Sequence, residues 1–158
     1  MNTVELLQYS VGVAFDILGQ VTADLTQEQA DWTPPGTASS IRDIYWHTLT
    51  YVDYFVRNYC IEGKRLPDTV ESRPDVLRMQ EVQIDLSELH QFAGDVRSTV
   101  QDWLSSLAPA DLERKRHTTV GELNVGQMLE ICIIWHINAH CGEISALKGC
   151  QGLKGYPW

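Results

Sequence analysis

Apolar residues recur at alternating spacings of three and four positions along two long stretches of the chain, as in helices that pack into a bundle. The first stretch runs from about Thr3 to about Ala23, with apolar positions at Val4, Leu7, Val11, Ala14, Leu18, Val21 and Leu25. The second runs roughly from Val76 to Leu107, with Val82, Leu86, Leu89, Ala93, Val96, Val100, Trp103 and Leu107. Each pattern predicts one helix with a buried stripe.

Two more helices are predicted from their capping residues. Ser39 or Ser40 is suited to cap a helix that continues to about Glu62, and Asn124 is suited to cap another over about Val125–Lys148. No stretch alternates like a strand for more than a few residues. The sequence therefore predicts an all-α protein, a four-helix bundle that forms a single domain over residues 1–158.

The connections between these helices differ in length. Thr26 opens a short turn with the look of a capping box, and Pro34 and Pro35 stop it. The segment from Lys64 to Pro74 is longer and contains two prolines. It is expected to be a crossover loop that leaves the direction of the third helix open.

The charge balance limits the classes of partner. The chain has 158 residues and a formal net charge of −9, with only twelve lysines and arginines. A protein that binds a phosphate backbone needs a basic surface. Nucleic acid is therefore not expected as a partner.

The first twenty residues contain Glu5 and Asp16 and lack a basic start followed by an apolar run. Neither a secretory signal nor a membrane span is expected, which places the protein in the cytoplasm. Its four cysteines show no CxxC pairing and are expected to be free thiols. They are Cys60, Cys132, Cys141 and Cys150.

Two histidines of the fourth predicted helix carry the clearest chemical signal. His136 and His140 are four residues apart in IIWHINAHCGEI, so their imidazoles point to the same side of the helix. That side is apolar, and buried imidazole nitrogens need polar partners. Together with His47 in the middle of the second helix, they predict a three-histidine metal site.

The face of the second helix around His47 is unusually polar and aromatic, as expected for a pocket. Asp43, Tyr51 and Tyr54 are candidates to orient ligands or substrate, although such aromatic residues also serve as core. Cys132 precedes His136 by one helical turn and is a weaker candidate, because a buried cysteine is usually a small apolar residue. His90 and His117 have no partner at ligand spacing.

Two segments of the chain resemble the DinB/YfiT-like family of four-helix-bundle metalloproteins. LTQEQADWTPPGTASSIRDIYWHTLTYVDYFV is similar to the family's tryptophan-bearing turn followed by a helix with a central histidine. HINAHCGEISALKG is similar to its His-x-x-x-His-x-Gly-Gln/Glu-Ile pattern. The resemblance implies that His47, His136 and His140 are the metal ligands. It also implies that Glu143, where the family often has Gln, binds a ligating histidine, binds the metal or acts as a base.

The resemblance leaves the reaction open, because the family includes thiol-dependent transferases and isomerases. Three imidazoles and water suit Zn²⁺, whereas additional waters or Glu143 would complete an octahedron around Ni²⁺, Fe²⁺ or Mn²⁺; zinc or nickel is preferred. With Glu143 and Tyr51 as the proton-transferring residues, the site would transfer a low-molecular-weight thiol to a small-molecule electrophile or hydrolyse a substrate. The alternative is a non-catalytic, stress-related binding or scaffold protein whose histidines form a polar core.

The opposite side of the fourth helix carries Ile131, Ile134 and Trp135, which a lone bundle would leave partly exposed. A homodimer interface would bury these residues. Two neighbouring helices within the same bundle would cover them equally well, and the homodimer is the preferred interpretation.

Overall fold

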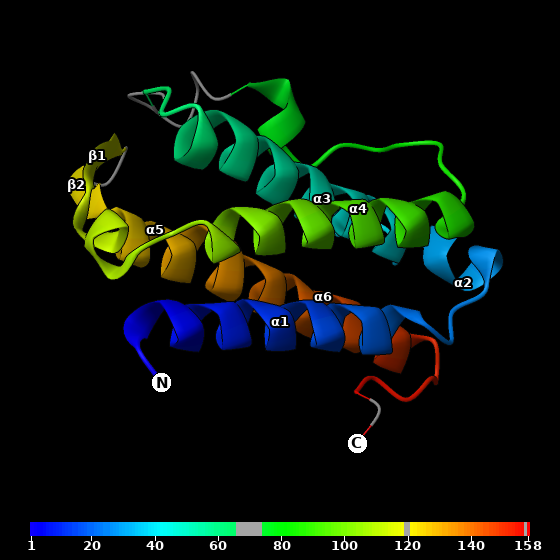
Figure 1. Cartoon of the computed structure of the whole chain (residues 1–158). Helices are drawn as coiled ribbons and strands as arrows, with labels where there is room; N and C mark the ends of the chain where they lie inside the picture. The colour runs from blue at the N-terminus through cyan, green and yellow to red at the C-terminus, as the bar shows by residue number, and fades with distance from the viewer. Residues whose placement is uncertain (66–73, 119–120, 157) are drawn as a thin grey trace.

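Four long helices form the body of the protein in the computed structural model, which describes residues 1–65, 74–118, 121–156 and 158 (Figure 1). The α-helices are α1 (Thr3–Thr22), α2 (Gln27–Asp31), α3 (Ile41–Phe55), α4 (Leu86–Ser105), α5 (Val125–Leu129) and α6 (His136–Cys150), and the strands are β1 (Lys115–Thr118) and β2 (Gly121–Asn124). Two π-helical segments, Val56–Ile61 and Glu130–Trp135, extend α3 and join α5 to α6. Short 3₁₀ turns cover Asp75–Leu77 and Pro109–Glu113.

The four-helix bundle predicted from the sequence is confirmed. Helix α1 packs against α4 and α6, and α3 packs against the same two helices, so α1 and α3 lie diagonally across the bundle. Leu18, Leu49, Val96 and Ile137, one from each long helix, are at most 1% exposed in the shared core. Among the described residues, no helix is both long and apolar enough to cross a membrane.

The directions of the helices explain the long connection between α3 and α4. In Figure 1, α1 and α6 run one way along the bundle, and α3 and α4 run the other way. Because α3 and α4 are parallel, the chain must return along the whole bundle between them. The predicted loop from Lys64 to Pro74 falls largely on residues 66–73, which lie outside the described part of the chain.

The predicted start of the third helix at Val76 was wrong, because α4 begins at Leu86. The backbone N–H of Val82 donates to Asp43 Oδ1 (3.0 Å), and that of Leu86 donates to Gln27 Oε1 (2.7 Å). These side chains on α3 and α2 hold the segment 74–85 in place without an α-helix. Leu86, whose N–H binds Gln27, is the first residue of α4.

A short hairpin, which was not predicted from the sequence, precedes α5. Strands β1 and β2 pair antiparallel in the register Lys115↔Asn124, Arg116↔Leu123, His117↔Glu122 and Thr118↔Gly121. Most of the described side chains in this hairpin are exposed or half-buried. Without a buried face, a strand has no reason to alternate apolar and polar residues.

The capping residues behave as the sequence predicted. Ser40 Oγ accepts from the backbone N–H of Asp43 at the start of α3 (3.1 Å). Asn124 Oδ1 accepts from the backbone N–H of Gln127, and Gln127 Oε1 accepts from that of Asn124 (2.8 and 2.9 Å). These caps fix where the two helices that carry histidines begin.

Candidate metal centre

Three histidines meet between α3 and α6, which pack directly against each other. His47 lies in the middle of α3, and His136 and His140 occupy the first two turns of α6. The ring centroids are separated by 5.3 Å (His47–His136), 5.1 Å (His47–His140) and 4.5 Å (His136–His140). One nitrogen from each ring lies within 4.8 Å of the other two. The structure thus brings together the three residues that the sequence singled out.

Two of these imidazoles carry nitrogens without a visible partner. His47 and His136 are 8% and 9% exposed, and His47 Nδ1 and His136 Nε2 are buried with no hydrogen-bond partner among the described residues. An unsatisfied buried polar atom costs about 1–3 kcal/mol. A cation bound by these two nitrogens would satisfy both of them. The residues present therefore fit a metal ion.

Burial keeps the same two rings uncharged. Desolvation, followed by the nearby His140 and His47 rings, lowers the pKa of His136 to about 2. Desolvation and then His140 also lower the pKa of His47. Metal ligation requires the neutral imidazole. The protein environment therefore holds both rings in the form that binds a metal.

The third ring is oriented by Glu143, one turn further along α6. His140 Nδ1 lies 2.8 Å from Glu143 Oε2. Because an ionised carboxylate can only accept, Nδ1 carries the proton and the lone pair is left on Nε2. A carboxylate that binds the second nitrogen of a histidine is a common support for a metal ligand. Of the three roles considered for Glu143, this contact corresponds to the first.

Tyr51 covers one side of the histidine cluster. Its ring stacks on His136 with a centroid distance of 4.0 Å and an interplanar angle of 22°. Phe55 stacks in turn on Tyr51 (6.0 Å, 6°). The stack restricts the orientation of the His136 ring.

Other candidates from the sequence do not join the cluster. The Asp43 carboxylate binds the backbone N–H of Val82, and Tyr54 packs edge-on against Tyr59 with 5.9 Å between centroids. Cys132 packs against a second apolar cluster around Phe55. His90 lies on α4, where its Nδ1 contacts the hydroxyl of Tyr45 (3.3 Å), and His117 lies in β1.

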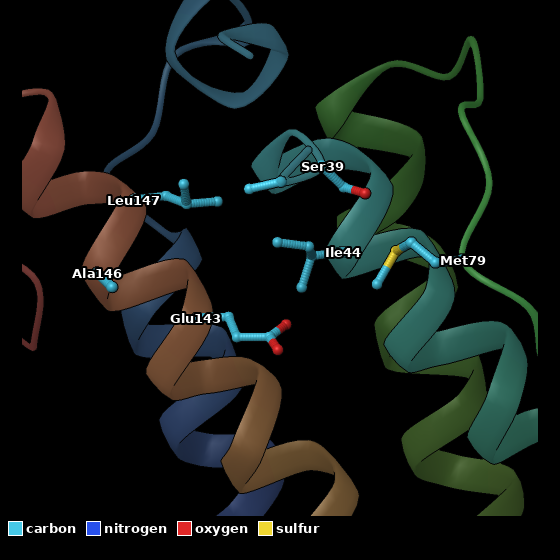
Figure 2. Close-up of a pocket in the computed structure, with 7 residues that line it drawn as sticks. Ser39, Ile44, Met79, Glu143, Ala146 and Leu147 are labelled. Carbon is cyan, nitrogen blue, oxygen red and sulfur yellow. The ribbon is translucent and has the colours of Figure 1, made fainter. Parts of the chain in front are cut away.

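A cavity of about 350 Å³ is lined in part by Glu143 (Figure 2), the residue that contacts His140. It is lined by Ala38, Ser39, Ile44, Met79, Glu143, Ala146 and Leu147. In Figure 2 the Glu143 carboxylate points into the space between α6 and the side chains of Ile44 and Met79. Met79 was not identified as a cavity residue from the sequence, because its position depends on the path of the chain after the long crossover.

The donor set suits a first-row divalent metal such as zinc or nickel. Zinc–nitrogen bonds of about 2.0–2.1 Å place tetrahedral ligand nitrogens about 3.3 Å apart. Nitrogens that now lie up to 4.8 Å apart would have to approach one another. Side-chain rotations that move each ring by about an ångström would suffice.

A family model described as the DinB superfamily matches residues 14–144, so the chain belongs to the DinB superfamily. Among solved structures, the chain is similar to YfiT from Bacillus subtilis, described as a probable metal-dependent hydrolase with an unusual four-helix bundle topology. The two share 15% sequence identity with a TM-score of 0.70, over 96% of this chain and 89% of YfiT. At this identity the likeness shows the fold. No curated protein matches the sequence.

Proposed function

We propose that this protein is a metal-dependent hydrolase of a small molecule, with His47, His136 and His140 as the metal ligands. One observation carries the proposal. Two buried imidazole nitrogens lack a partner among the described residues of the chain, in a three-histidine cluster that Glu143 connects to a cavity. The description of YfiT, which shares the fold, as a probable metal-dependent hydrolase supports the same class of reaction. Zinc or nickel is the proposed metal, and iron or manganese would also suit three imidazoles completed by other ligands.

A divalent ion at this site would supply Lewis acidity, which polarises a substrate carbonyl and lowers the pKa of water. The side chains would supply orientation and proton transfer. Glu143 Oε2 holds the His140 ring through its Nδ1–H, while the carboxylate also lines the cavity. There it can accept the proton that an attacking water loses. Tyr51 keeps the His136 ring in place by stacking on it, and proton transfer by its hydroxyl stays a prediction.

Hydrolysis fits the cavity better than transfer of a thiol. Among the described residues that line the cavity, only Ser39 and Glu143 are polar and none is cationic. A negatively charged thiol cofactor would therefore meet no countercharge from these residues and would face the Glu143 carboxylate. The water molecule consumed in hydrolysis is uncharged and needs no cationic residue in the cavity.

The test is hydrolysis of a panel of p-nitrophenyl carboxylic esters by metal-free and zinc- or nickel-reconstituted protein. Metal should raise kcat/KM by about a hundredfold or more. Glu143→Gln should retain the metal site but lower kcat/KM by about tenfold to a hundredfold, because it loses the carboxylate that orients His140 and accepts the proton. Glu130→Gln, which changes an exposed glutamate outside the cavity, should keep wild-type activity.

If the reconstituted protein binds metal but hydrolyses the whole panel no faster than the metal-free protein, the hydrolase proposal fails. The non-catalytic binding or scaffold role would then be the better interpretation. An activity that is equal in wild type and Glu143→Gln would remove Glu143 from the mechanism while leaving the metal requirement in place.

The proposal includes a homodimer, formed through an apolar face made of exposed residues on α1 and on the neighbouring π-helical segment Glu130–Trp135. Leu6, Tyr9 and Val13 on α1 are 46%, 67% and 36% exposed, and Ile131 and Trp135 are 44% and 65% exposed. The grouping of Ile134 with these residues was wrong, because Ile134 is only 9% exposed and packs in the core. The π-helical turn at Glu130–Trp135 changes the periodicity of the helix and turns Ile134 inward.

In light scattering coupled to gel filtration, the wild-type chain of 17.9 kDa should elute with about twice that mass. Trp135→Glu should yield the monomer, because a charge in the centre of an apolar interface loses its hydration. Trp158→Glu changes a tryptophan that is 70% exposed outside this face and should remain dimeric. A monomeric wild-type protein would rule the dimer out.

The four cysteines are free thiols, which agrees with the proposed location in the reducing cytoplasm.

A further inference from the structure

The cavity beside the histidines is placed where the non-reacting part of a substrate would lie. Ile44 precedes His47 by three residues on α3, and Glu143 follows His140 by three residues on α6. Because α3 and α6 run in opposite directions (Figure 1), moving backward along α3 and forward along α6 leads to the same end of the bundle. The cavity therefore lies about one helical turn, or roughly 5 Å, along the bundle from the histidine cluster, and Glu143, which contacts His140, lines it.

We infer that this cavity binds the apolar chain of a small, uncharged carbonyl compound, with the carbonyl end directed towards Glu143 and the histidines. The inference rests on the proposed hydrolase function and specifies its class of substrate. Ala38, Ile44, Met79, Ala146 and Leu147 supply the apolar lining. Sites of this kind pair an apolar wall with a few polar groups that fix orientation.

The charge of the site selects against anionic compounds. The Glu143 carboxylate is half exposed, with 54% of its side-chain surface accessible, and lies on the cavity wall between the apolar residues and His140. No cationic side chain among the described lining residues offsets it, and the chain carries a net charge of −9. A carboxylate-bearing ligand would lose hydration and face repulsion without gaining an ion pair.

The size of the cavity limits the length of the chain it can bind. A volume of about 350 Å³ is near the lower end of the roughly 300–1,000 Å³ typical of small-molecule sites. Met79 forms part of the wall, and the segment that carries it is tied to α3 by the hydrogen bond from Val82 N–H to Asp43. The flexible thioether can adjust the wall to different chains, but the tie keeps the wall close to α3.

The test measures binding to the metal-free protein by NMR titration with three probes: propanamide, hexanamide and hexanoate. Metal-free protein is used because a carboxylate would also coordinate a metal ion. Burial of a methylene strengthens binding up to about fourfold, so hexanamide should bind at least about tenfold more tightly than propanamide. Hexanoate, equal in chain length but negatively charged, should bind at least about tenfold more weakly than hexanamide.

Two variants and one matched control locate the effect. Ala146→Phe fills the cavity from an exposed helical position and should abolish the preference for hexanamide, whereas Ala110→Phe, the same change at an exposed position outside the cavity, should preserve it. Glu143→Gln should bring the affinity for hexanoate closer to that for hexanamide. The probe series on the wild type is independent of how well any variant folds.

Equal or undetectable binding of all three probes to the wild type would overturn the inference, as would a preference for hexanamide that survives Ala146→Phe. This result is separable from the test of hydrolysis. Selective binding without metal-dependent hydrolysis would retain the apolar site and reject the hydrolase. Hydrolysis of the esters with no dependence on chain length, in a protein that binds the three probes equally, would retain the hydrolase and reject the apolar site.

Discussion

Replacing both His136 and His140 with alanine is expected to reduce bound zinc or nickel from about one ion per chain to less than about a tenth. The change removes two of three imidazoles whose nitrogens lie within 4.8 Å of one another. The remaining His47 offers a single ligand, and one neutral imidazole holds a divalent ion far more weakly than three. The measurement is inductively coupled plasma mass spectrometry on tag-free protein after reconstitution and removal of excess metal.

The matched control replaces two histidines that lie elsewhere. His90 contacts Tyr45 from α4, and His117 lies in the exposed hairpin, so a variant with alanine at both positions should keep the full metal content. Circular dichroism of each variant checks that its helices are intact. A metal content that survives loss of His136 and His140, or a wild-type protein that binds no metal even after reconstitution, would reject the site and favour a polar core.

The three-histidine cluster shows what a sequence can reveal about a site. The spacing of His136 and His140 determines that both rings project from the same side of α6, whatever the rest of the fold. Nothing in the spacing brings His47 to them, because that contact depends on which helices are neighbours. The central place of His47 in its own predicted helix and the resemblance to a known family supplied this step, and the packing of α3 against α6 now provides its physical basis.

The periodicity of apolar residues predicted the bundle but misplaced the start of α4. Val82 continues the apolar spacing of Leu86 and Leu89, yet its backbone N–H is bound by Asp43 on another helix. A periodic pattern indicates which residues are buried, but it does not indicate which groups their backbone N–H groups bind. Asp85 and Glu88 carried the better local signal, since Glu88 accepts from the backbone N–H of Asp85 at the true start of α4 (3.2 Å).

The cavity and the π-helical turns were beyond the reach of sequence patterns. A π-helical segment such as Glu130–Trp135 adds a residue to each turn without a characteristic composition, so Ile134 was assigned to the wrong side of the helix. The cavity combines residues from α3, α6 and the segment that follows the crossover. Its chemistry emerges only when these distant parts of the chain are placed together.

The metal-free protein is expected to lose stability as the pH falls below about 6.5, and His136 should account for much of the loss. The pKa of a histidine in the unfolded chain is about 6.5, whereas burial lowers that of folded His136 to about 2. Above pH 6.5 both states are neutral and the ring contributes no pH dependence. Below it, only the unfolded state takes up the proton, so the free energy of unfolding falls by about 1.4 kcal/mol per pH unit. Burial lowers the pKa of His47 as well, which adds a change of the same sign.

Between pH 6.5 and 4.5 the contribution of His136 alone reaches about 2–3 kcal/mol, a large share of the 5–15 kcal/mol typical of a small domain. Urea denaturation at several pH values measures it. His136→Phe cannot take up the proton and should show a shallower decline, while His117→Phe, at an exposed histidine of the hairpin, should follow the wild type. Carboxylates titrate in all three proteins, so the difference between their slopes isolates the buried ring. Equal slopes in wild type and His136→Phe would mean that the folded protein accepts a proton at this site, which is incompatible with a neutral ring held ready to bind a metal.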